Sequence, residues 1–218
     1  MKNFRSLAID GGAGTGKSTL SNLLSERNNY LYVETGSHYR AFSWMLMESE
    51  IEPEKVNEFI ESNSVSILSK IIKNKSLITI DQQSFSKEKL RSPKVNQNVS
   101  RYAAIPALRK LLFDYQYSQV ELAKESGFNG VILEGRDIGT KILPEADLKI
   151  FLWADAQIRV RRRSSDGETD SIISRDQMDI NRMEAPLVCA EGAIKIDTGQ
   201  FSPDEVYEQV MRALELLR

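Results

Sequence analysis

Short apolar runs alternate with amphipathic stretches along this chain. Five runs are bounded by polar or glycine residues, as is typical of buried strands. They cover residues 6–10, 30–33, 130–133, 148–153 and 193–197. Helical patterns separate most of these runs. Strands that alternate with helices predict a parallel sheet covered on both faces, and therefore an α/β fold.

The helical stretches carry recognisable signals of their own. Residues 17–27 predict a helix directly after the first strand. Positions 108, 111, 112 and 115 are apolar or aromatic and follow the i, i+3, i+4, i+7 spacing of one helical face. The last helix is predicted to begin after Ser202, the expected N-cap, with Glu205 completing a capping box.

A stretch from about residue 54 to residue 101 interrupts the alternation. It contains a helix-like pattern over 56–73, a polar strand-like piece at 77–81 and a Ser- and Lys-rich connection that leads to Pro93. A chain of 218 residues suits one large domain. We therefore interpret this stretch as an insertion into a single core.

Composition excludes several classes of protein. The 29 Lys and Arg against 31 Asp and Glu give a net charge of −2, which argues against an overall basic nucleic-acid-binding protein. No uncharged run exceeds eight residues, far short of the ~18 that a membrane span needs. Cys189 is the only cysteine and His38 the only histidine, which excludes thiolate zinc clusters and multi-histidine sites. The single cysteine and an N-terminus with no room for a signal peptide predict a cytoplasmic protein.

Residues 11–18 match the pattern G-x-x-x-x-G-K-[ST] of a phosphate-binding loop. Its glycines let backbone N–H groups surround phosphate oxygens, and the following helix N-terminus adds partial positive charge. Lys17 would reach the outer phosphates and the Ser18 hydroxyl would bind magnesium. A glycine-rich turn without a ligand is the alternative. The residues expected to contact the nucleotide are Gly11, Gly12, Ala13, Gly14, Thr15, Gly16, Lys17, Ser18 and Thr19.

The loop leaves the reaction open, and the arginines narrow it. The GTPase motifs D-x-x-G and N-K-x-D are absent. Arg40 and Arg136 follow predicted strands, and segments after strand ends converge on the ligand crevice of a parallel sheet. Arg175 and Arg182 lie seven residues apart on one helical face. Several guanidinium groups beside a phosphate loop suit a second, phosphorylated substrate, although each alone could be a solvated surface charge.

The scarcity of bases fits the same interpretation. A monophosphate oxygen is already an anionic nucleophile, so transfer to it needs positioning and charge neutralisation rather than a His or Cys base. A catalytic role for His38 is therefore not expected. The run at residues 161–163 could be a solvated helix face or a nucleic-acid patch, but its place after the fourth strand favours a lid.

Further segments match one known family. Besides the loop, they are Thr35-Gly36 with Tyr39-Arg40, residues 91–95 through Ser100, residues 103–106 with Arg109, residues 135–140 and 149–152, Arg175-Asp176 with Asp179 and Arg182, and residues 185–187 and 196–198. On these motifs the chain resembles bacterial cytidylate kinases over nearly its whole length. The Gly-Arg-Asp-Ile-Gly-Thr segment at 135–140, combined with the Arg/Asp helix, is the most specific of them.

The resemblance implies a fold and an activity. The fold is α/β, the P-loop kinase fold: a five-stranded parallel sheet flanked by helices, an inserted monophosphate-binding sub-domain and a short mobile lid. Within one domain, 1–218, the core would be about 1–50 and 103–218, the insertion 51–102 and the lid 159–175. The activity is transfer of the γ-phosphoryl group of ATP to CMP or dCMP with magnesium, by a monomer that binds no nucleic acid and no membrane.

The resemblance also implies roles for individual residues. The implied catalytic residues are Lys17, Arg136 and the lid arginines Arg159, Arg162 and Arg163. The implied substrate-binding residues are Arg40, Arg136 and Arg182 for the acceptor phosphate; Ser100, Arg109 and Asp137 for cytosine; Arg175 and Asp179 near the sugar; and Thr35 and Tyr39 in the matching motif.

The chemistry of cytosine supports one of these roles. The carboxylate of Asp137 can accept a hydrogen bond from the exocyclic amine of cytosine, whereas uracil has an acceptor at that position. In the alternative interpretation, Asp137 only holds Arg136 in place through an ion pair.

The chain also departs from the family pattern. Met178 stands where the family usually has an arginine, Glu34 replaces an aspartate, and eleven residues separate Arg163 from Arg175, so the lid is short. Two alternatives therefore remain open: a regulatory nucleotide-binding protein that has lost transfer activity, and a kinase for another small acceptor.

Overall fold

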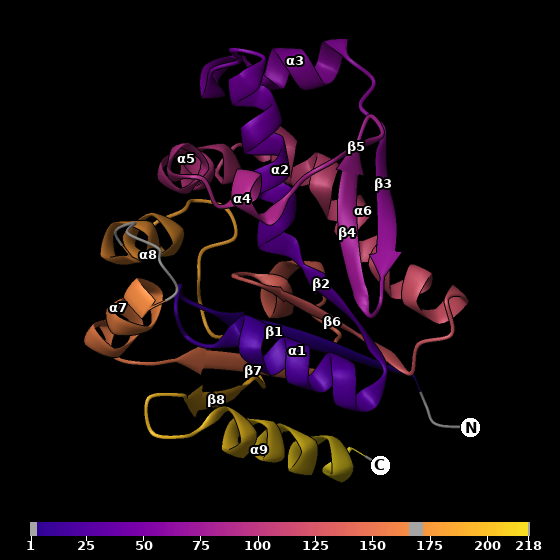
Figure 1. Ribbon diagram of the computed structural model, residues 1–218, viewed down its shortest axis with the longest axis vertical. Coiled ribbons are helices and arrows are strands. Elements are labelled where there is room, and N and C mark those ends of the chain that lie inside the picture. The colour runs from indigo at the N-terminus through magenta and orange to yellow at the C-terminus, as the bar shows by residue number, and fades with distance from the viewer. Residues whose placement is uncertain (1–3, 166–171, 218) are drawn as a thin grey trace.

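One sheet runs through the molecule, with helices on both of its faces (Figure 1). The computed structural model describes residues 4–165 and 172–217, with the backbone alone for residues 172, 173 and 175. Five parallel strands form the centre of the sheet, in the order β2 (Tyr30–Glu34), β6 (Gly130–Gly135), β1 (Arg5–Gly11), β7 (Leu148–Trp153) and β8 (Ile194–Asp197). The five predicted strands and the parallel core are confirmed.

Helices and short helical turns surround this sheet. In chain order they are α1 (Lys17–Asn28), α2 (Thr35–Glu48), η1 (Pro53–Lys55), α3 (Val56–Ser62), α4 (Lys87–Leu90), α5 (Pro93–Ala103), α6 (Pro106–Glu125), η2 (Ile138–Ile142), α7 (Ala156–Ser165), α8 (Ile172–Ile180) and α9 (Pro203–Leu216). Among the described residues, none of the helices combines the length and apolar character needed to cross a bilayer.

Alternation along the strands explains why both faces of the sheet are covered. Successive side chains of a strand point to opposite faces. Leu7 and Ile9 of β1 are fully buried in a cluster with residues of α1 and α9. Ala8, between them, belongs to a second cluster with residues of α6 and η2 on the other face. The apolar runs in the sequence are thus buried on both sides, as a parallel sheet requires.

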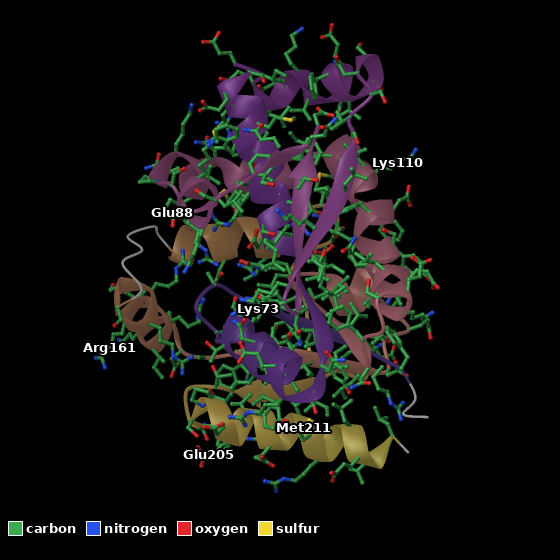
Figure 2. All side chains as sticks on the ribbon, turned by 45° about the vertical axis from the view of Figure 1, so that its right-hand side comes forward. Lys73, Glu88, Lys110, Arg161, Glu205 and Met211 are labelled. Carbon is green, nitrogen blue, oxygen red and sulfur yellow. The ribbon has the colours of Figure 1, made fainter. Side chains whose placement is uncertain are left out.

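The secondary structure of the inserted stretch differs from the prediction. The helix predicted over 56–73 ends at Ser62, and Ile67–Ile72 instead forms strand β3, antiparallel to β4 (Lys75–Ile80). A two-residue turn joins the strands, with Lys73 (labelled in Figure 2) at φ 54°. Side chains along β3 alternate between half-buried and exposed, which is the period of a strand at a sheet surface. Pairing with β4 therefore overrides the helical pattern.

The insertion also joins the main sheet. Strand β4 lies parallel to β2, and the two-residue strand β5 (Gln83–Ser84) pairs with β4. Among the described residues the sheet thus has eight strands. A third apolar cluster joins α2, α3, α5 and α6 beyond the β2 edge of the parallel core. This cluster supports α2 and α5, which contribute side chains to the site described below.

Candidate active site

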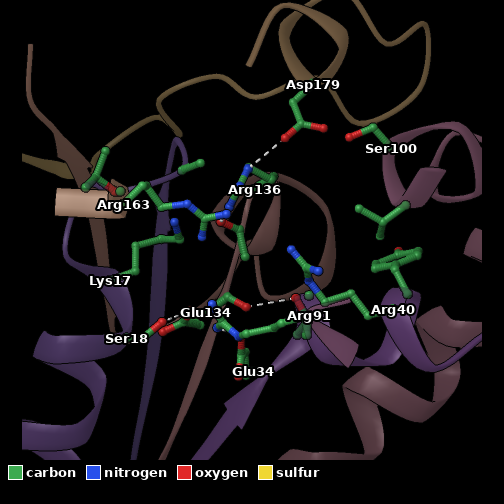
Figure 3. Close-up of a pocket in the computed structure, with 18 of the residues that line it drawn as sticks. Lys17, Ser18, Glu34, Arg40, Arg91, Ser100, Glu134, Arg136, Arg163 and Asp179 are labelled. Atoms are coloured by element: carbon green, nitrogen blue, oxygen red, sulfur yellow. Dashed lines mark hydrogen bonds and ion pairs between the residues drawn. The ribbon is translucent and has the colours of Figure 1, made fainter. Parts of the chain in front are cut away.

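A cleft of about 1030 Å³ opens at the carboxyl ends of the central strands. The phosphate loop follows β1, Glu34 ends β2 and Gly135 ends β6, and all three segments line the cleft. Figure 3 shows side chains from these segments and from α2, α5, α7 and α8 pointing into it. Segments far apart in sequence thus converge at one edge of the sheet, as the sequence predicted.

The phosphate loop joins β1 to α1 and depends on glycine at two points. Gly16, the residue before α1, has φ 87°, a left-handed conformation that side chains disfavour. A Cβ on Gly11 would lie 2.2 Å from the Leu152 carbonyl oxygen, so no larger residue fits there. The resulting turn presents the N-terminus of α1 to the cleft, where its partial positive charge favours anions.

Lys17 is the cation of this loop. Its side chain is directed into the cleft (Figure 3), and its Nζ donates to the Gly12 carbonyl oxygen at 2.8 Å. Burial lowers the pKa of Lys17 to about 7, with Arg136 acting in the same direction and Glu134 opposing it. A bound phosphate would favour the charged form, so Lys17 is a lysine whose charge depends on its ligand.

Ser18 lies beside a buried carboxylate that the sequence analysis did not single out. The Ser18 hydroxyl donates to Glu134 Oε1 and the Tyr32 hydroxyl donates to Oε2, both at 2.9 Å. Glu34 is the strand neighbour of Glu134 and forms an ion pair with Arg91 at 3.0 Å. Burial raises the pKa of Glu34, and the charge of Glu134 adds to the effect.

Three arginines form a group that we call the acceptor wall: Arg40, Arg136 and Arg182. All three line the cleft. Arg136 and Arg182 each donate to the Asp179 carboxylate of α8 at 2.9 Å (Figure 3 shows the Arg136 contact). Arg40 donates to the Leu90 carbonyl oxygen at 2.8 Å and to Asn96 Oδ1 at 2.6 Å. Guanidinium groups fixed in this way suit a planar or tetrahedral anion.

A second ion pair lies behind this wall. The Arg109 guanidinium donates to the Asp137 carboxylate and, through Nη1, to the Ala103 carbonyl oxygen at 3.1 Å. Burial raises the pKa of Asp137, while Arg109 opposes the shift. Asp137 lines the cleft beside Tyr39 and Ser100. Among the described residues, the ion pair of Asp137 is with Arg109, and that of Arg136 is with Asp179.

Comparison with known proteins decides the family. The sequence model of the cytidylate kinase family matches residues 7–216. The cytidylate kinase of Alkaliphilus metalliredigens is 40% identical over 220 residues, covering 96% of each chain. That of Caldicellulosiruptor bescii is 39% identical over 217 residues, covering 94% of this chain and 93% of its own. The chain belongs to the cytidylate kinase family.

Solved structures agree on the fold. A sugar kinase from Janibacter sp. HTCC2649 has a TM-score of 0.50 at 14% identity and covers 97% of this chain and 95% of its own. A protein from Thermus thermophilus has a TM-score of 0.50 at 18% identity and covers 99% and 98%. At these identities the likeness shows only that the cytidylate kinase chain has an α/β fold shared with other kinases.

The arginines that the family resemblance assigns to a lid occupy different positions. Arg162 and Arg163 line the cleft, and Arg162 donates to the Thr198 carbonyl oxygen at 2.7 Å. Arg161 is exposed and points away from the body of the molecule (Figure 2). Arg159 is absent from the lining of the cleft and contacts Asp176 of α8 instead. The arginine run is therefore partly a cleft wall and partly a solvated face.

The remaining predicted residues can be placed against the same cleft. Thr19 and Thr35 line it, together with Ala13, Gly14, Thr15 and Gly16. Gly11 and Gly12 do not line it. For Arg175 the backbone lies in α8, but its side chain is outside the described residues. His38 is fully buried in α2, away from the cleft lining, and both ring nitrogens lack hydrogen-bond partners among the described residues.

Several lining residues were missed by sequence reasoning. Glu134, Lys87, Glu88 and Arg91 all line the cleft. The sequence could have indicated Glu134, because it is a charged residue directly after the apolar run of a predicted strand. Arg91 lies in a segment that matches the family, but that segment suggested no role for it. Lys87 had no signal, because only the packing of the insertion against α2 brings it to the cleft.

Proposed function

We propose that the protein transfers the γ-phosphoryl group of ATP to the phosphate of CMP or dCMP, giving ADP and CDP or dCDP. One observation carries the proposal: three arginines held by hydrogen bonds line the same cleft as the phosphate loop. Membership of the cytidylate kinase family supports the same activity. An acceptor phosphate on the arginines would then lie opposite the outer phosphate of ATP.

On the donor side, the loop and Lys17 would hold the β- and γ-phosphates. During transfer the bond between the γ-phosphorus and the bridging oxygen breaks, and an acceptor phosphate oxygen forms the new bond. Lys17, Arg136 and the lid arginines Arg162 and Arg163 would neutralise the charge that spreads over the transferred group. His38 is too deeply buried to act as a base, and an anionic acceptor needs none.

Magnesium fits the residues beside the loop. No cluster of three or more His, Cys, Asp or Glu side chains suited to a metal occurs among the described residues. Magnesium in phosphoryl-transfer sites instead uses phosphate oxygens and water with one or two protein oxygens. Ser18 and Glu134, already in contact at 2.9 Å, would supply those oxygens. Bound there, magnesium would supply positive charge to the phosphates.

On the acceptor side, we propose that Asp137, Arg109 and Ser100 recognise cytosine. The Asp137 carboxylate would accept from the exocyclic amine, and Arg109 would donate to the ring acceptors. The contact between Asp137 and Arg109 supports this assignment, because it fixes the carboxylate at the cleft surface. Arg175 and Asp179 would lie near the sugar.

We also propose the division into a core (1–50 and 103–218), a monophosphate-binding insertion (51–102) and a lid (159–175), within a cytoplasmic monomer. The insertion and the lid would close together over the substrates, because open access of water would lead to ATP hydrolysis. CMP and ATP together should then protect both segments from hydrogen exchange. Unchanged protection in both segments would contradict closure.

A coupled assay of ADP release tests the proposed function. The acceptors are CMP, dCMP, UMP, AMP and GMP, with a reaction that lacks any acceptor as the control. The expected result is rapid release with CMP or dCMP and little release otherwise. Nucleotide binding without transfer to any acceptor would instead support a regulatory protein. Transfer to another monophosphate alone would assign a different kinase.

A further inference from the structure

Helix α8 carries two buried carboxylates that contact different sides of the cleft. Asp179 accepts from Arg136 and Arg182 on the acceptor wall, at 2.9 Å each. Asp176 lies three residues earlier, on the same helical face. Its Oδ1 accepts from the backbone N–H of Ala13 in the phosphate loop at 3.1 Å. One helix therefore contacts both the donor loop and the acceptor wall.

Arg159 of α7 strengthens the contact between Asp176 and the loop. Its Nη1 donates to the Asp176 carboxylate and to the Ala13 carbonyl oxygen, the latter at 3.0 Å. Its Nε donates to the Ala154 carbonyl oxygen at 2.9 Å, which fixes the guanidinium. The side chains of Arg159 and Asp176 are only 13% and 12% exposed. A single buried ion pair thus holds both polar backbone groups of Ala13.

Two loop glycines permit this close approach. A Cβ on Gly12 would lie 3.0 Å from Asp176 Oδ2 and 3.1 Å from Arg159 Nη1. A Cβ on Gly14 would lie 2.9 Å from the Arg159 carbonyl oxygen, at a residue whose φ is +73°. These glycines admit α7 and α8 against the loop, which is a reason for glycine separate from phosphate binding. Figure 1 shows α7 and α8 at the end of β1, where the loop begins.

We propose that Asp176 is a positioning residue: through α8, it fixes the phosphate loop relative to the arginines of the acceptor wall. The spacing of Asp176 and Asp179 on one helix would set the offset between the donor and acceptor phosphates. Phosphoryl transfer depends on that offset, because displacement of reacting groups by about 1 Å can slow a reaction roughly a hundredfold. This inference rests on the proposed function, since it concerns the alignment of the same two substrates.

The test compares variants by single-turnover phosphoryl transfer at saturating ATP and CMP, together with KM for each substrate. The variants are Asp176→Ala, Asp176→Asn, Arg159→Ala and the double variant Asp176→Ala with Arg159→Ala. Gln177→Ala is the matched control, because Gln177 is the exposed neighbour of Asp176 on α8. Thermal melts establish that each variant is folded.

Loss of alignment should slow transfer without weakening acceptor binding. Asp176→Ala should reduce the single-turnover rate roughly tenfold to a hundredfold, with KM for CMP within about twofold of wild type. Asp176→Asn should lose less, because its amide oxygen can still accept from Ala13 N–H. The double variant should be no slower than the slower single variant, because residues that act as a unit are not additive. Gln177→Ala should match wild type.

Several results would overturn the positioning role. They are a normal rate in a folded Asp176→Ala variant, a rise in KM for CMP that equals the loss in rate, or additive losses in the double variant. Should Asp176→Ala not fold, Arg159→Ala decides, because it removes the other half of the ion pair that holds Ala13, and a wild-type rate in that folded variant counts against the proposal. Wild-type protein that turns over no monophosphate would instead refute the proposed function, so the two failures are distinguishable.

Discussion

The donor loop and the acceptor wall are built on different principles. The donor loop is eight consecutive residues whose chemistry comes from backbone groups, one lysine and a helix N-terminus. The acceptor wall is assembled from Arg40 on α2, Arg136 directly after β6 and Arg182 just beyond α8. Arg136 and Arg182 are held by ion pairs with the buried Asp179, and Arg40 is held by hydrogen bonds. A backbone site depends mainly on local conformation, whereas a side-chain site depends on the whole fold.

The two halves of the cleft should respond differently to substitution. Removing a loop side chain takes away a ligand contact and leaves few partners unsatisfied. Removing one member of a buried ion pair leaves the other charge uncompensated, which costs about 3–5 kcal/mol in buried pairs generally. Substitutions in the phosphate loop should therefore lower activity with little loss of stability, whereas substitutions in the acceptor wall should lower both.

The strongest test of this contrast is Lys17→Ala. In the proposed function Lys17 would supply charge to the outer phosphates, and a charged contact of this kind contributes about 1.5–3 kcal/mol or more. Transfer should therefore fall by roughly tenfold to more than a hundredfold, while the melting temperature stays near that of wild type. The coupled assay and a thermal melt measure both. Near-normal turnover in the folded variant would argue that this loop is not the donor site.

On the acceptor side, the test is Asp137→Ala with CMP and UMP compared. Loss of the contact to the cytosine amine should lower the CMP:UMP ratio of kcat/KM by roughly tenfold to a hundredfold, from about 1.5–3 kcal/mol for a charged hydrogen bond. Because Arg109 is buried beside it, the variant should also be less stable than Lys17→Ala.

A matched variant separates the two effects of Asp137. Asp137→Asn keeps the shape and an acceptor oxygen, but its amide can also donate to uracil. It should therefore be more stable than the alanine variant while still lowering the CMP:UMP ratio. If both rates fell equally in both variants, Asp137 would be a scaffold for Arg109 and not a reader of the base.

The same contrast explains what the sequence could predict. The phosphate loop could be predicted from the sequence because its function needs specific residue types at fixed local spacing. The five core strands could be predicted because they are apolar runs. Strand β3 could not, because residues 56–73 carry a helix-like spacing and only pairing with β4 selects the extended form. There the helix-like spacing is overridden by pairing with a strand that begins only three residues after β3 ends.

The acceptor side shows a second limit. Arg40 and Arg136 could be placed near the cleft from the ends of predicted strands. Arg182 was predicted to share a helical face with Arg175, but α8 ends at Ile180 and Arg182 lies just beyond it. The partners of these arginines could not be predicted. The contact of Arg159 with Asp176 joins residues 17 positions apart on two helices, and it moves Arg159 from the cleft to the loop backbone. Ion-pair partners depend on side-chain reach within a finished fold, which periodicity does not encode.

A smaller effect is expected from His38, buried within the acceptor half. Burial lowers the pKa of His38 from its usual 6.5 to about 3. Between these values the unfolded chain binds the proton and the folded chain does not, so folding stability is lost as pH falls from 6.5 toward 3. The slope from this one group is at most about 1.4 kcal/mol per pH unit. His38→Leu should flatten the pH dependence of unfolding by that amount.

Other groups titrate in the same pH range, so the test must use the difference in unfolding free energy between wild type and His38→Leu. Burial raises the pKa of Asp10 to about 6, although the N–H groups of Ile138 and Gly139 oppose the shift. A raised carboxyl pKa has the opposite sign, because the folded chain holds the proton below pH 6. Wild type and His38→Leu both carry Asp10. The difference between their free energies of urea unfolding, measured from pH 4 to 7, therefore isolates the contribution of His38. An unchanged slope would contradict its burial as a neutral ring.

The smallest effect is expected far from both halves of the cleft, at the N-terminus of α9. The Ser202 hydroxyl accepts from the Glu205 N–H at 3.3 Å, and Glu205 Oε2 accepts from the Ser202 N–H at 2.8 Å, so the predicted capping box is confirmed. Ser202→Ala should lower the free energy of unfolding by about 1 kcal/mol, a shift in melting temperature of about 2–4 °C for a chain of this size. Ser202→Thr, which keeps the hydroxyl, is the control and should stay closer to wild type.

Because α9 lines no part of the cleft, kcat and KM should not change in either variant. A loss of activity in Ser202→Ala at temperatures where the protein is fully folded would mean that α9 is coupled to the cleft through β8. Stability and function would then not be separable at α9, although they are expected to be separable in the phosphate loop.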